Sequence, residues 1–441
     1  MPETPVDRAA IPLHAGPGET GTEADSPQLL HDPVGYFTGG YRAHGPVFRT
    51  RYRGFDWVTI AGIEANDFFW QNTQDWSYER AGPGFRDQFG PTYVTQLDGP
   101  AHLRKRRLLK PGFSAEAVAQ YVPVMARETA RFLEERSAWS IDANEWVPAL
   151  LLSLNKATLL RTELSQEQMR DAIRLEAELI YGVGVSASPR EYFSRPGYPE
   201  LKARVFALVE RELAARSDGR RAPDNLQALI DQDPGNLDPL TREELLNDAY
   251  MLLVAGIHNT ARLLTRILER ISQDPPWVEE LRAELADSTP DAFSRGMSRF
   301  PKLRATILEG ERLHPGATFL KRRPIRDLAF AGHTLEAGAR VLQAHTLPHF
   351  LSEYYADPLA FRPRRWLEAQ PPQRKALADF GGGSHICIGM NLTRVQVPIV
   401  LAEMLRRYDW TLGYAPSFAL QVDAGLGIAE RHEPITLSAR G

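Results

Sequence analysis

A single cysteine stands inside a glycine-rich loop, and this feature restricts the chain more than any other. The segment Phe380-Gly-Gly-Gly-Ser-His-Ile-Cys387-Ile-Gly389 comes directly before a helical pattern that starts near Met390. Glycines permit positive φ angles and let the backbone approach a planar ligand closely. A helix that begins after the loop offers free N–H groups and its positive dipole to the sulfur, which lowers the pKa of a thiol. The loop therefore predicts a metal ligand or a nucleophile at Cys387.

The surroundings of Cys387 in the sequence separate these two chemical roles. A nucleophile needs a nearby His–Asn or His–Asp pair, and no such triad context surrounds the cysteine, which disfavours a cysteine hydrolase. A metal held by one cysteine takes its other ligands from a cofactor, as in haem. Cys387 is the only cysteine, so an intrachain disulfide and a multi-cysteine metal site are excluded. An inert buried cysteine is the remaining alternative, which the fixed spacing of Phe380 and His385 disfavours.

The segment FGGGSHICIG resembles the haem-binding loop of the cytochrome P-450 family, Phe-x-x-Gly-x-x-x-Cys-x-Gly. The resemblance implies that Cys387 is the axial thiolate of haem b and that Phe380 packs against the iron side of the loop. It also implies that His385 reaches a haem propionate, and Gly389 fills the last fixed position. The implied fold is mostly α with small β-sheets, in a single large domain over residues 29–441 that follows a flexible tail over residues 1–28.

Two further groups of residues resemble motifs of the same family. Glu309 and Arg312 lie three apart in a helical pattern, so they share a face and can form a charge-assisted pair. By resemblance they form a structural lock behind the haem, with Arg365 as the third partner. Contacts to the haem propionates are implied for residues on two other segments. They are His102 and Arg106, four apart on one helix face, and Arg322, for which Arg323 is a competing assignment.

The segment Ala255-Gly256-Ile257-His258-Asn259-Thr260 departs from the family pattern of the helix that crosses the distal haem face, Ala-Gly-x-acid-Thr. His258 stands at the acid position and Asn259 at the alcohol position. An amide cannot relay a proton as a hydroxyl does, whereas histidine titrates near neutral pH and can. We therefore expect proton delivery from His258, water or the substrate. Thr260 is expected to face elsewhere, because one residue along a helix rotates a side chain by about 100°.

This departure leaves the reaction open. The resemblance implies a haem-thiolate oxidoreductase that activates dioxygen with electrons from a separate ferredoxin or flavodoxin and its reductase. Peroxide-driven catalysis, or coupling, epoxidation, desaturation and rearrangement in place of hydroxylation, are alternatives, as is a non-catalytic haem-binding sensor. The substrate is expected to be a small molecule, with tailoring of a bacterial secondary metabolite as the setting. Candidate residues lining its pocket are Tyr93, Val94, Tyr181 and Leu426.

Periodicity and composition predict the rest of the organisation. A hairpin is expected between Val47 and Ile60, and a second strand-rich stretch over Leu328 to Val341. Helices are predicted over Ala115–Ser137, Ser165–Gly182, Tyr198–Ser217, Thr241–Ser272, Pro301–Leu313 and Met390–Arg407. The net charge of −4 provides no basic surplus for nucleic acid. No apolar run is long enough for a membrane anchor, and a reducing, cytoplasmic compartment fits the cysteine count.

Overall fold

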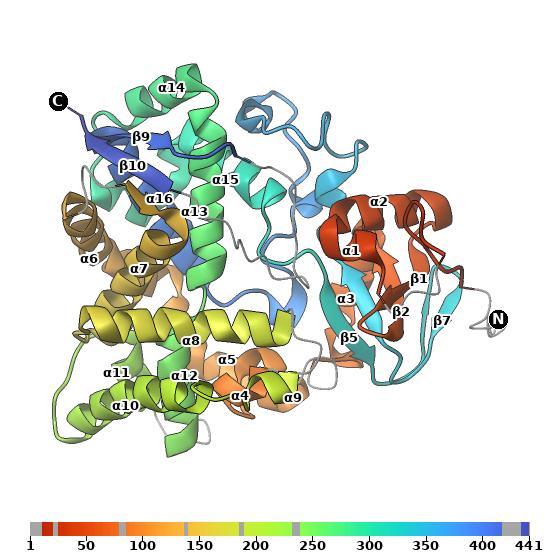
Figure 1. Cartoon of the computed structure of the whole chain (residues 1–441), viewed down its shortest axis with the longest axis horizontal. Helices are drawn as coiled ribbons and strands as arrows, with labels where there is room; N and C mark the ends of the chain where they lie inside the picture. Colours follow the sequence, from red (N-terminus) through yellow and green to blue (C-terminus); the bar gives the residue numbers. More distant parts are fainter. Residues whose placement is uncertain are drawn as a thin grey trace.

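Apolar residues recur every three or four positions over most of the chain, and these segments form a large helical part (Figure 1). The structure is a computed structural model that describes residues 11–20, 25–78, 85–135, 140–184, 189–231, 239–416 and 434–440. The helices are α1 (Pro27–His31), α2 (Pro33–His44), α3 (Ile63–Gln71), α4 (Arg86–Phe89), α5 (Gly99–Leu109), α6 (Ala115–Glu134), α7 (Ala143–Asn155), α8 (Gln166–Gly184), α9 (Pro189–Tyr192), α10 (Tyr198–Ser217), α11 (Asn225–Ile230), α12 (Arg242–Val254), α13 (Ile257–Ser272), α14 (Pro275–Leu285), α15 (Pro301–Leu313) and α16 (Met390–Arg407).

Five of the six predicted helices form with ends within three residues of the prediction, and the sixth is broken. The predicted helix Thr241–Ser272 divides into α12 and α13, because Ala255 is extended with ψ 134° and Gly256 takes φ 84°. A residue with a Cβ atom reaches this left-handed region at a cost of roughly 1–2 kcal/mol. Glycine reaches it freely, so the chain can unwind here and resume a helix at Ile257.

A second, smaller part of the molecule is built around a β-sheet and carries α1 to α3 (Figure 1). The predicted hairpin forms with Val47 opposite Ile60, and its turn uses Arg53 and Gly54 at positive φ. The five-stranded sheet has the order β1-β2-β8-β5-β3, the three-stranded sheet β4-β10-β9, and the two-stranded sheet β6-β7. The strands are β1 (Val47–Tyr52), β2 (Phe55–Ala61), β3 (Trp76–Ser77), β4 (Ser140–Asp142), β5 (Leu320–Pro324), β6 (Leu328–Phe330), β7 (His333–Leu335), β8 (Val341–Ala344), β9 (Tyr408–Leu412) and β10 (Pro434–Ala439).

The described part of the N-terminal segment packs against this sheet, which differs from the flexible tail expected over residues 1–28. Ile11 is 1% exposed within the apolar cluster under β1 and β2. The backbone of Arg49 accepts a hydrogen bond from the N–H of His14 (3.0 Å) and donates one to Pro12 (2.7 Å). A buried isoleucine and edge-strand hydrogen bonds outweigh the polar composition of the segment. Residues 1–10 and 21–24 lie outside the described residues.

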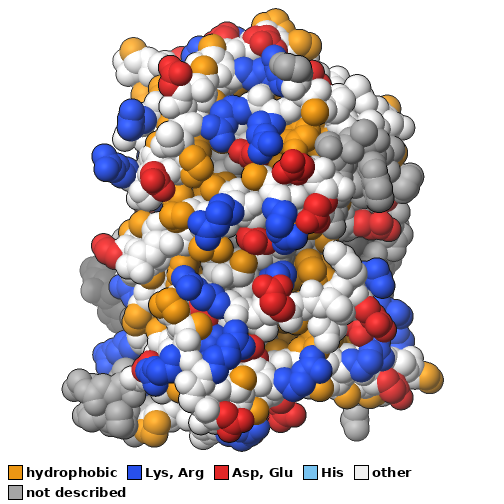
Figure 2. Space-filling view, turned by 90° about the vertical axis from the view of Figure 1, so that its left-hand side faces the viewer, with side chains coloured by type: hydrophobic (Ala, Val, Ile, Leu, Met, Phe, Trp, Pro, Cys, Tyr) orange, Lys and Arg blue, Asp and Glu red, His pale blue; other side chains and the backbone are white. Residues whose placement is uncertain are grey.

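The lengths of the helices and the charges on one face of the molecule are considered before the cavity. No helix among the described residues is long and apolar enough to cross a membrane. Figure 2 shows one face of the molecule, where acidic and basic side chains are interspersed with small apolar areas. The main apolar core lies in the helical part, and its helices α7, α12, α13 and α16 surround the cavity described next.

Candidate functional site

The glycine loop packs so closely against α3 that only glycine fits two of its positions. A Cβ atom on Gly382 would lie 2.4 Å from the ring of Trp70, and one on Gly383 would lie 2.6 Å from Thr73. Gly381 and Gly383 take φ angles of 69° and 65°. The loop then turns back on itself, because the N–H of Cys387 donates a hydrogen bond of 2.9 Å to the carbonyl of Phe380. This fixes the direction of the cysteine side chain.

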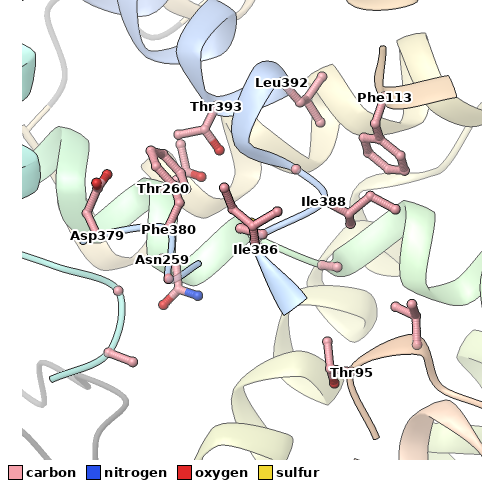
Figure 3. Close-up of a pocket in the computed structure, with 18 of the residues that line it drawn as sticks. Thr95, Phe113, Asn259, Thr260, Asp379, Phe380, Ile386, Ile388, Leu392 and Thr393 are labelled. Carbon is pink, nitrogen blue, oxygen red and sulfur yellow. The ribbon is translucent and has the colours of Figure 1, made fainter. Parts of the chain in front are cut away.

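Cys387 lines a cavity of about 380 Å³. Residues of the glycine loop, α13 and α16 form its wall, among them Phe380, Asn259 and Leu392 (Figure 3). The exposed surface of Cys387 is cavity surface, because the residue is enclosed by protein. Burial raises the pKa of the thiol, although the N–H groups of Gly389 and Met390 and the charge of Arg106 oppose this. The sequence predicted a lowered thiol pKa, and this prediction is wrong for the protein chain alone, because burial outweighs the helix N-terminus. A bound cation would favour the thiolate at this position.

Four protonatable side chains from three segments lie close together at one edge of the cavity, which His102, Arg106 and His385 line and which Arg322 adjoins through Tyr78. The rings of His102, on α5, and His385, in the glycine loop, stack with centroids 3.7 Å apart. Arg106 donates a hydrogen bond of 2.7 Å to the carbonyl of Ile386. Arg322, on β5, is 1% exposed, and its guanidinium lies 3.1 Å from the centre of the Tyr78 ring. The structure thus brings together all four residues that the sequence assigned to the propionates.

Arg322 and Arg323 take opposite directions, as neighbours on a strand must. Arg323 donates a hydrogen bond of 2.6 Å to the carbonyl of Gly338, in the turn beyond β7. Arg322 instead lies near His385, whose pKa it helps to lower. Of the two arginines, Arg322 is therefore the one on the same side of β5 as His385.

This edge of the cavity carries positive charge that the protein compensates poorly. Burial, and then the neighbouring cations, lower the pKa of His102 to about 4 and that of His385 to about 2. Asp98 acts on His102 and Arg322, but its oxygens already accept hydrogen bonds from Ser77 (2.5 Å) and from the N–H of Tyr78 (2.8 Å). Three buried nitrogens find no partner among the described residues: His102 Nε2, Arg322 Nε and His345 Nδ1. Such a donor set fits a planar cofactor that carries carboxylates at its edge.

The predicted lock is fully formed behind the loop. Arg312 binds both oxygens of Glu309 (2.7 and 3.0 Å), and Arg365 adds a bond of 3.1 Å. The indole N–H of Trp366 and the backbone N–H of Arg362 each donate a hydrogen bond of 2.9 Å to the same Glu309 carboxylate. The guanidiniums of Arg312 and Arg365 also reach backbone carbonyls between Ala356 and Ala360, and Arg312 reaches the carbonyl of His349. A buried ion pair is stable only with such additional hydrogen bonds.

The segment at the helix break presents two polar side chains to the cavity. Ala255, Gly256, Asn259 and Thr260 all line it (Figure 3). The expectation that Thr260 faces elsewhere is wrong, since Thr260 lines the cavity together with Asn259, its neighbour in the first turn of α13. His258 is not among the lining residues, and its Nδ1 contacts the Glu176 carboxylate on α8. This placement gives no support to His258 as a proton donor to the cavity.

Two of the four predicted pocket residues line the cavity. Tyr93 and Val94 line the cavity, next to Thr95. The side chain of Tyr181 and the whole of Leu426 lie outside the described residues. Most other walls of the cavity are apolar. They include Phe113, Leu151, Leu159, Met251, Leu252, Leu263 and Leu320.

Two features of the cavity wall escaped the sequence analysis. His345, at the end of β8, is 2% exposed, and burial and then Arg322 lower its pKa to about 3. Glu311 and Asp379 form a carboxyl pair in the wall, and burial raises the pKa of Asp379 to about 6 and that of Glu311 as well. The available signal was a second acidic residue within the Glu-x-x-Arg motif itself, at Glu311.

Comparisons with known proteins agree with this geometry. The family model described as cytochrome P450 matches residues 200–423, just over half of the chain. Cyclooctat-9-en-7-ol 5-monooxygenase of Streptomyces melanosporofaciens is 27% identical over 340 residues, 73% of each chain. Lanosterol 14-alpha demethylase of Mus musculus is 24% identical over 407 residues, 87% of this chain and 80% of that protein. The solved structure of a retinoic acid bound cyanobacterial CYP120A1 is 21% identical, with TM-score 0.79 over 92% of this chain and 94% of that one.

Proposed function

Because the chain belongs to the cytochrome P450 family, an oxidoreductase family of the monooxygenase type, we propose that it binds haem b through Cys387 and oxidises a small, largely apolar organic molecule with dioxygen. The observation that carries this proposal is the position of the Cys387 thiol. The residue lines a cavity that has unpartnered histidine nitrogens at one edge and residues of α13 in its wall. The fold of the cyanobacterial structure, with TM-score 0.79, supports the same arrangement.

The residues of the cavity divide the work of holding the cofactor. His102, Arg106, Arg322 and His385 would bind the propionates, and the N–H groups of Gly389 and Met390 would share the negative charge of the sulfur. Bound haem supplies the dioxygen chemistry, which a thiolate ligand assists by favouring O–O cleavage. The lock of Glu309, Arg312 and Arg365 would hold the chain behind the loop. His345 would add a further donor at the edge.

The protein's own part in the reaction lies with the polar groups of the first turn of α13. The Thr260 hydroxyl is able to accept and donate a hydrogen bond, so it can pass a proton from water in the cavity. The Asn259 amide can orient that water or a polar group of the substrate, since it lies beside Gly316 and is exposed to the cavity. The apolar walls exclude other water.

The substrate class follows from the same walls. Leucine, methionine and phenylalanine side chains favour a hydrocarbon skeleton with few polar groups. The names of two relatives refer to cyclooctat-9-en-7-ol and lanosterol, both alcohols, and that of the structure refers to retinoic acid. We place the substrate among such molecules, as an intermediate of bacterial secondary metabolism. Electrons would come from a separate ferredoxin or flavodoxin and its reductase.

The absorption spectrum of the reduced, carbon monoxide-treated protein tests the assignment. Wild type should give the long-wavelength band of a haem thiolate, and Cys387→Ala should lose this band. Addition of apolar alcohols should shift the resting spectrum of the wild type. A purified protein that remains colourless after reconstitution with haem would refute the proposal.

Use of peroxide as the oxidant is the second candidate, and Asn259 is the observation that favours it. Asn259 occupies the alcohol position and faces the cavity, so the usual hydroxyl is missing there. Thr260, which also faces the cavity, argues for dioxygen. Product formation with hydrogen peroxide and no reductase would favour the peroxide route. Improved coupling of reductant to product in Asn259→Thr, with Thr260→Ala as its counterpart, would favour dioxygen.

A further inference from the structure

Two consecutive residues of α8, Leu175 and Glu176, take part in contacts that lead to α12 and to α13, the two helices on either side of the break. The carboxylate of Glu176 contacts Nδ1 of His258 on α13. The carbonyl of Leu175 accepts a hydrogen bond of 2.7 Å from the amide of Gln88 on α4, and the Gln88 oxygen accepts one of 2.8 Å from the hydroxyl of Tyr250 on α12. One tie therefore reaches the chain before the break, and the other reaches it after the break.

The polar groups in these contacts are buried, so the loss of a partner would be costly for each of them. Gln88 and Tyr250 are 0% exposed, and Glu176 is 6% exposed. A buried polar group that loses its partner costs about 1–3 kcal/mol, and more if it is charged. Burial lowers the pKa of His258, but the Glu176 carboxylate more than offsets this, and the net pKa lies above its usual value. The Glu176 carboxylate therefore favours the protonated, ion-paired form of His258.

The first turn of α13 depends on such ties, because the helix before it cannot orient it. The N–H groups that begin a helix have no intrahelical acceptor, and the first bond of α13 runs from Thr260 to the carbonyl of Gly256 (3.0 Å). Gly256 has φ 84°, and a Cβ atom there would meet nothing within 4 Å. Side-chain contacts therefore set the orientation of the first turn: Ile257 is 1% exposed in the apolar core, and His258 lies between Gly256 and the residues that face the cavity.

We propose that Glu176 is a positioning residue, which holds the first turn of α13 through His258 so that Asn259 and Thr260 face the cavity, while Gln88 holds the end of α12 against the same helix. Glu176 touches neither cofactor nor substrate in this assignment. The inference rests on the proposed function, since it concerns the geometry of the oxygen side of a bound haem. It gives His258 a structural partner in place of the proton-donating role that the sequence suggested.

The infrared stretching band of carbon monoxide on the reduced, haem-loaded protein tests this proposal, because its frequency responds to the polar groups that face the ligand. Glu176→Ala and His258→Ala should each shift or split the band. The double variant should give no larger change than either single one, since both remove the same contact. The exchanged pair, Glu176→His with His258→Glu, should restore a single band near the wild-type position.

Asp171→Asn is the matched control on the same helix. Asp171 accepts hydrogen bonds from Arg204 on α10 (2.7 and 3.0 Å) and contacts neither α12 nor α13 in the interactions of the described residues. Its band should match that of wild type. Glu176→Gln, which keeps the size of the side chain, replaces Glu176→Ala if the latter does not fold.

Different results would refute the proposed function and the positioning role of Glu176. Absence of the thiolate-type absorption band in wild type would refute the proposed function itself. If that band is intact in the Glu176 and His258 variants and their infrared bands equal that of Asp171→Asn, the positioning role is refuted.

Discussion

Glu309 and Glu311 lie on either side of Gly310 in α15, both buried, and their surroundings give them opposite effects on stability. Glu309 accepts hydrogen bonds from Arg312, Arg365 and Trp366. Glu311 instead faces the carboxyl of Asp379, and its Oε2 has no hydrogen-bond partner among the described residues. Residues of the same type, two positions apart, therefore provide a matched pair for mutation.

Glu309→Gln should destabilise the protein strongly. The change removes the negative charge between two buried guanidiniums and leaves them uncompensated, which costs about 3–5 kcal/mol for a buried pair. Urea unfolding of the haem-loaded protein, followed by circular dichroism, measures the loss. Glu311→Gln is the control, because it removes a carboxylate of equal burial without breaking an ion pair of this lock. Equal midpoints for Glu309→Gln and wild type would contradict the role of the lock.

Glu311→Gln should change how stability depends on pH. The pKa of Asp379 is raised to about 6, and that of Glu311 is also raised, first by burial. The folded state therefore holds protons that the unfolded state has released, so the contribution of this pair to stability is fully present below pH 4 and is lost as pH rises through about 6.

Glu311→Gln leaves Asp379 without a carboxyl partner but still near Arg394 and Arg374, so Asp379 ionises more easily. Relative to wild type, the variant should gain about 1–3 kcal/mol at pH 8 and little at pH 4.5. Thermal unfolding across this pH range measures the difference. A gain in unfolding free energy that is the same at every pH would show that ionisation of Glu311 and Asp379 does not affect stability.

At the scale of elements, the break between α12 and α13 is the feature that shapes the cavity. Ala255 and Gly256 leave the helical conformation, and both line the cavity. Asn259 and Thr260 both follow the break in α13, so they remain one residue step apart around the same axis. The left-handed glycine lets α13 start in a direction that α12 does not set, and in that direction both residues line the cavity. Conformational freedom at one residue thus decides which polar groups the site contains.

Gly256→Ala tests the break, and Gly197→Ala is a close control. Both glycines precede a helix at similar φ angles, 84° and 86°, and a Cβ atom on either meets nothing within 4 Å. Each variant should lose roughly 1–2 kcal/mol of stability from backbone strain alone. Gly256→Ala alone should alter the carbon monoxide band and the binding of apolar alcohols. Similar spectra for the two variants would show that the break does not set the cavity geometry.

At the scale of the whole molecule, the sequence predicted the parts of the fold and site that depend on local patterns. The glycine loop, the lock of Glu309 and Arg312, and His102 with Arg106 each lie within a few residues, so spacing alone places them on one face. The helices α10, α15 and α16 have the bounds that periodicity predicted. Apolar periodicity is a direct consequence of burying one helix face, and it survives in any sequence that forms the core.

The features that the sequence did not reveal depend on contacts between distant segments. Glu176 and His258 are 82 residues apart, and neither shows a pattern that names the other. The break at Gly256 is equally hidden, because a glycine within a periodic apolar segment is compatible with an unbroken helix. Ile11 lies in a polar segment, and its burial follows from the sheet edge it meets. These parts of the structure follow from tertiary packing.

The positive edge of the cavity leads to a prediction for the stability of the whole molecule. Arg106 and Arg322 lie with His102 and His385 where a haem would place its carboxylates, and burial lowers the pKa of both arginines, that of Arg322 to about 10. A cofactor that binds only the folded state stabilises it by about 2.7 kcal/mol at a hundred times its dissociation constant. Without haem, the two guanidiniums stay buried at this edge with no carboxylate of a cofactor to neutralise them.

Haem-depleted protein should therefore unfold at a lower temperature than haem-loaded protein, and added salt should narrow the difference. Salt supplies anions that partly neutralise the uncompensated guanidiniums once solvent fills the cavity, whereas it affects the neutralised, haem-filled site much less. Thermal unfolding of both forms at low and high ionic strength measures this. Arg322→Met should reduce the effect of salt on the haem-depleted form, while Arg323→Met, on the other face of β5, should leave it unchanged. A difference in unfolding temperature between the two forms that is independent of salt, and of Arg322, would mean that lost packing and not uncompensated charge destabilises the haem-depleted protein.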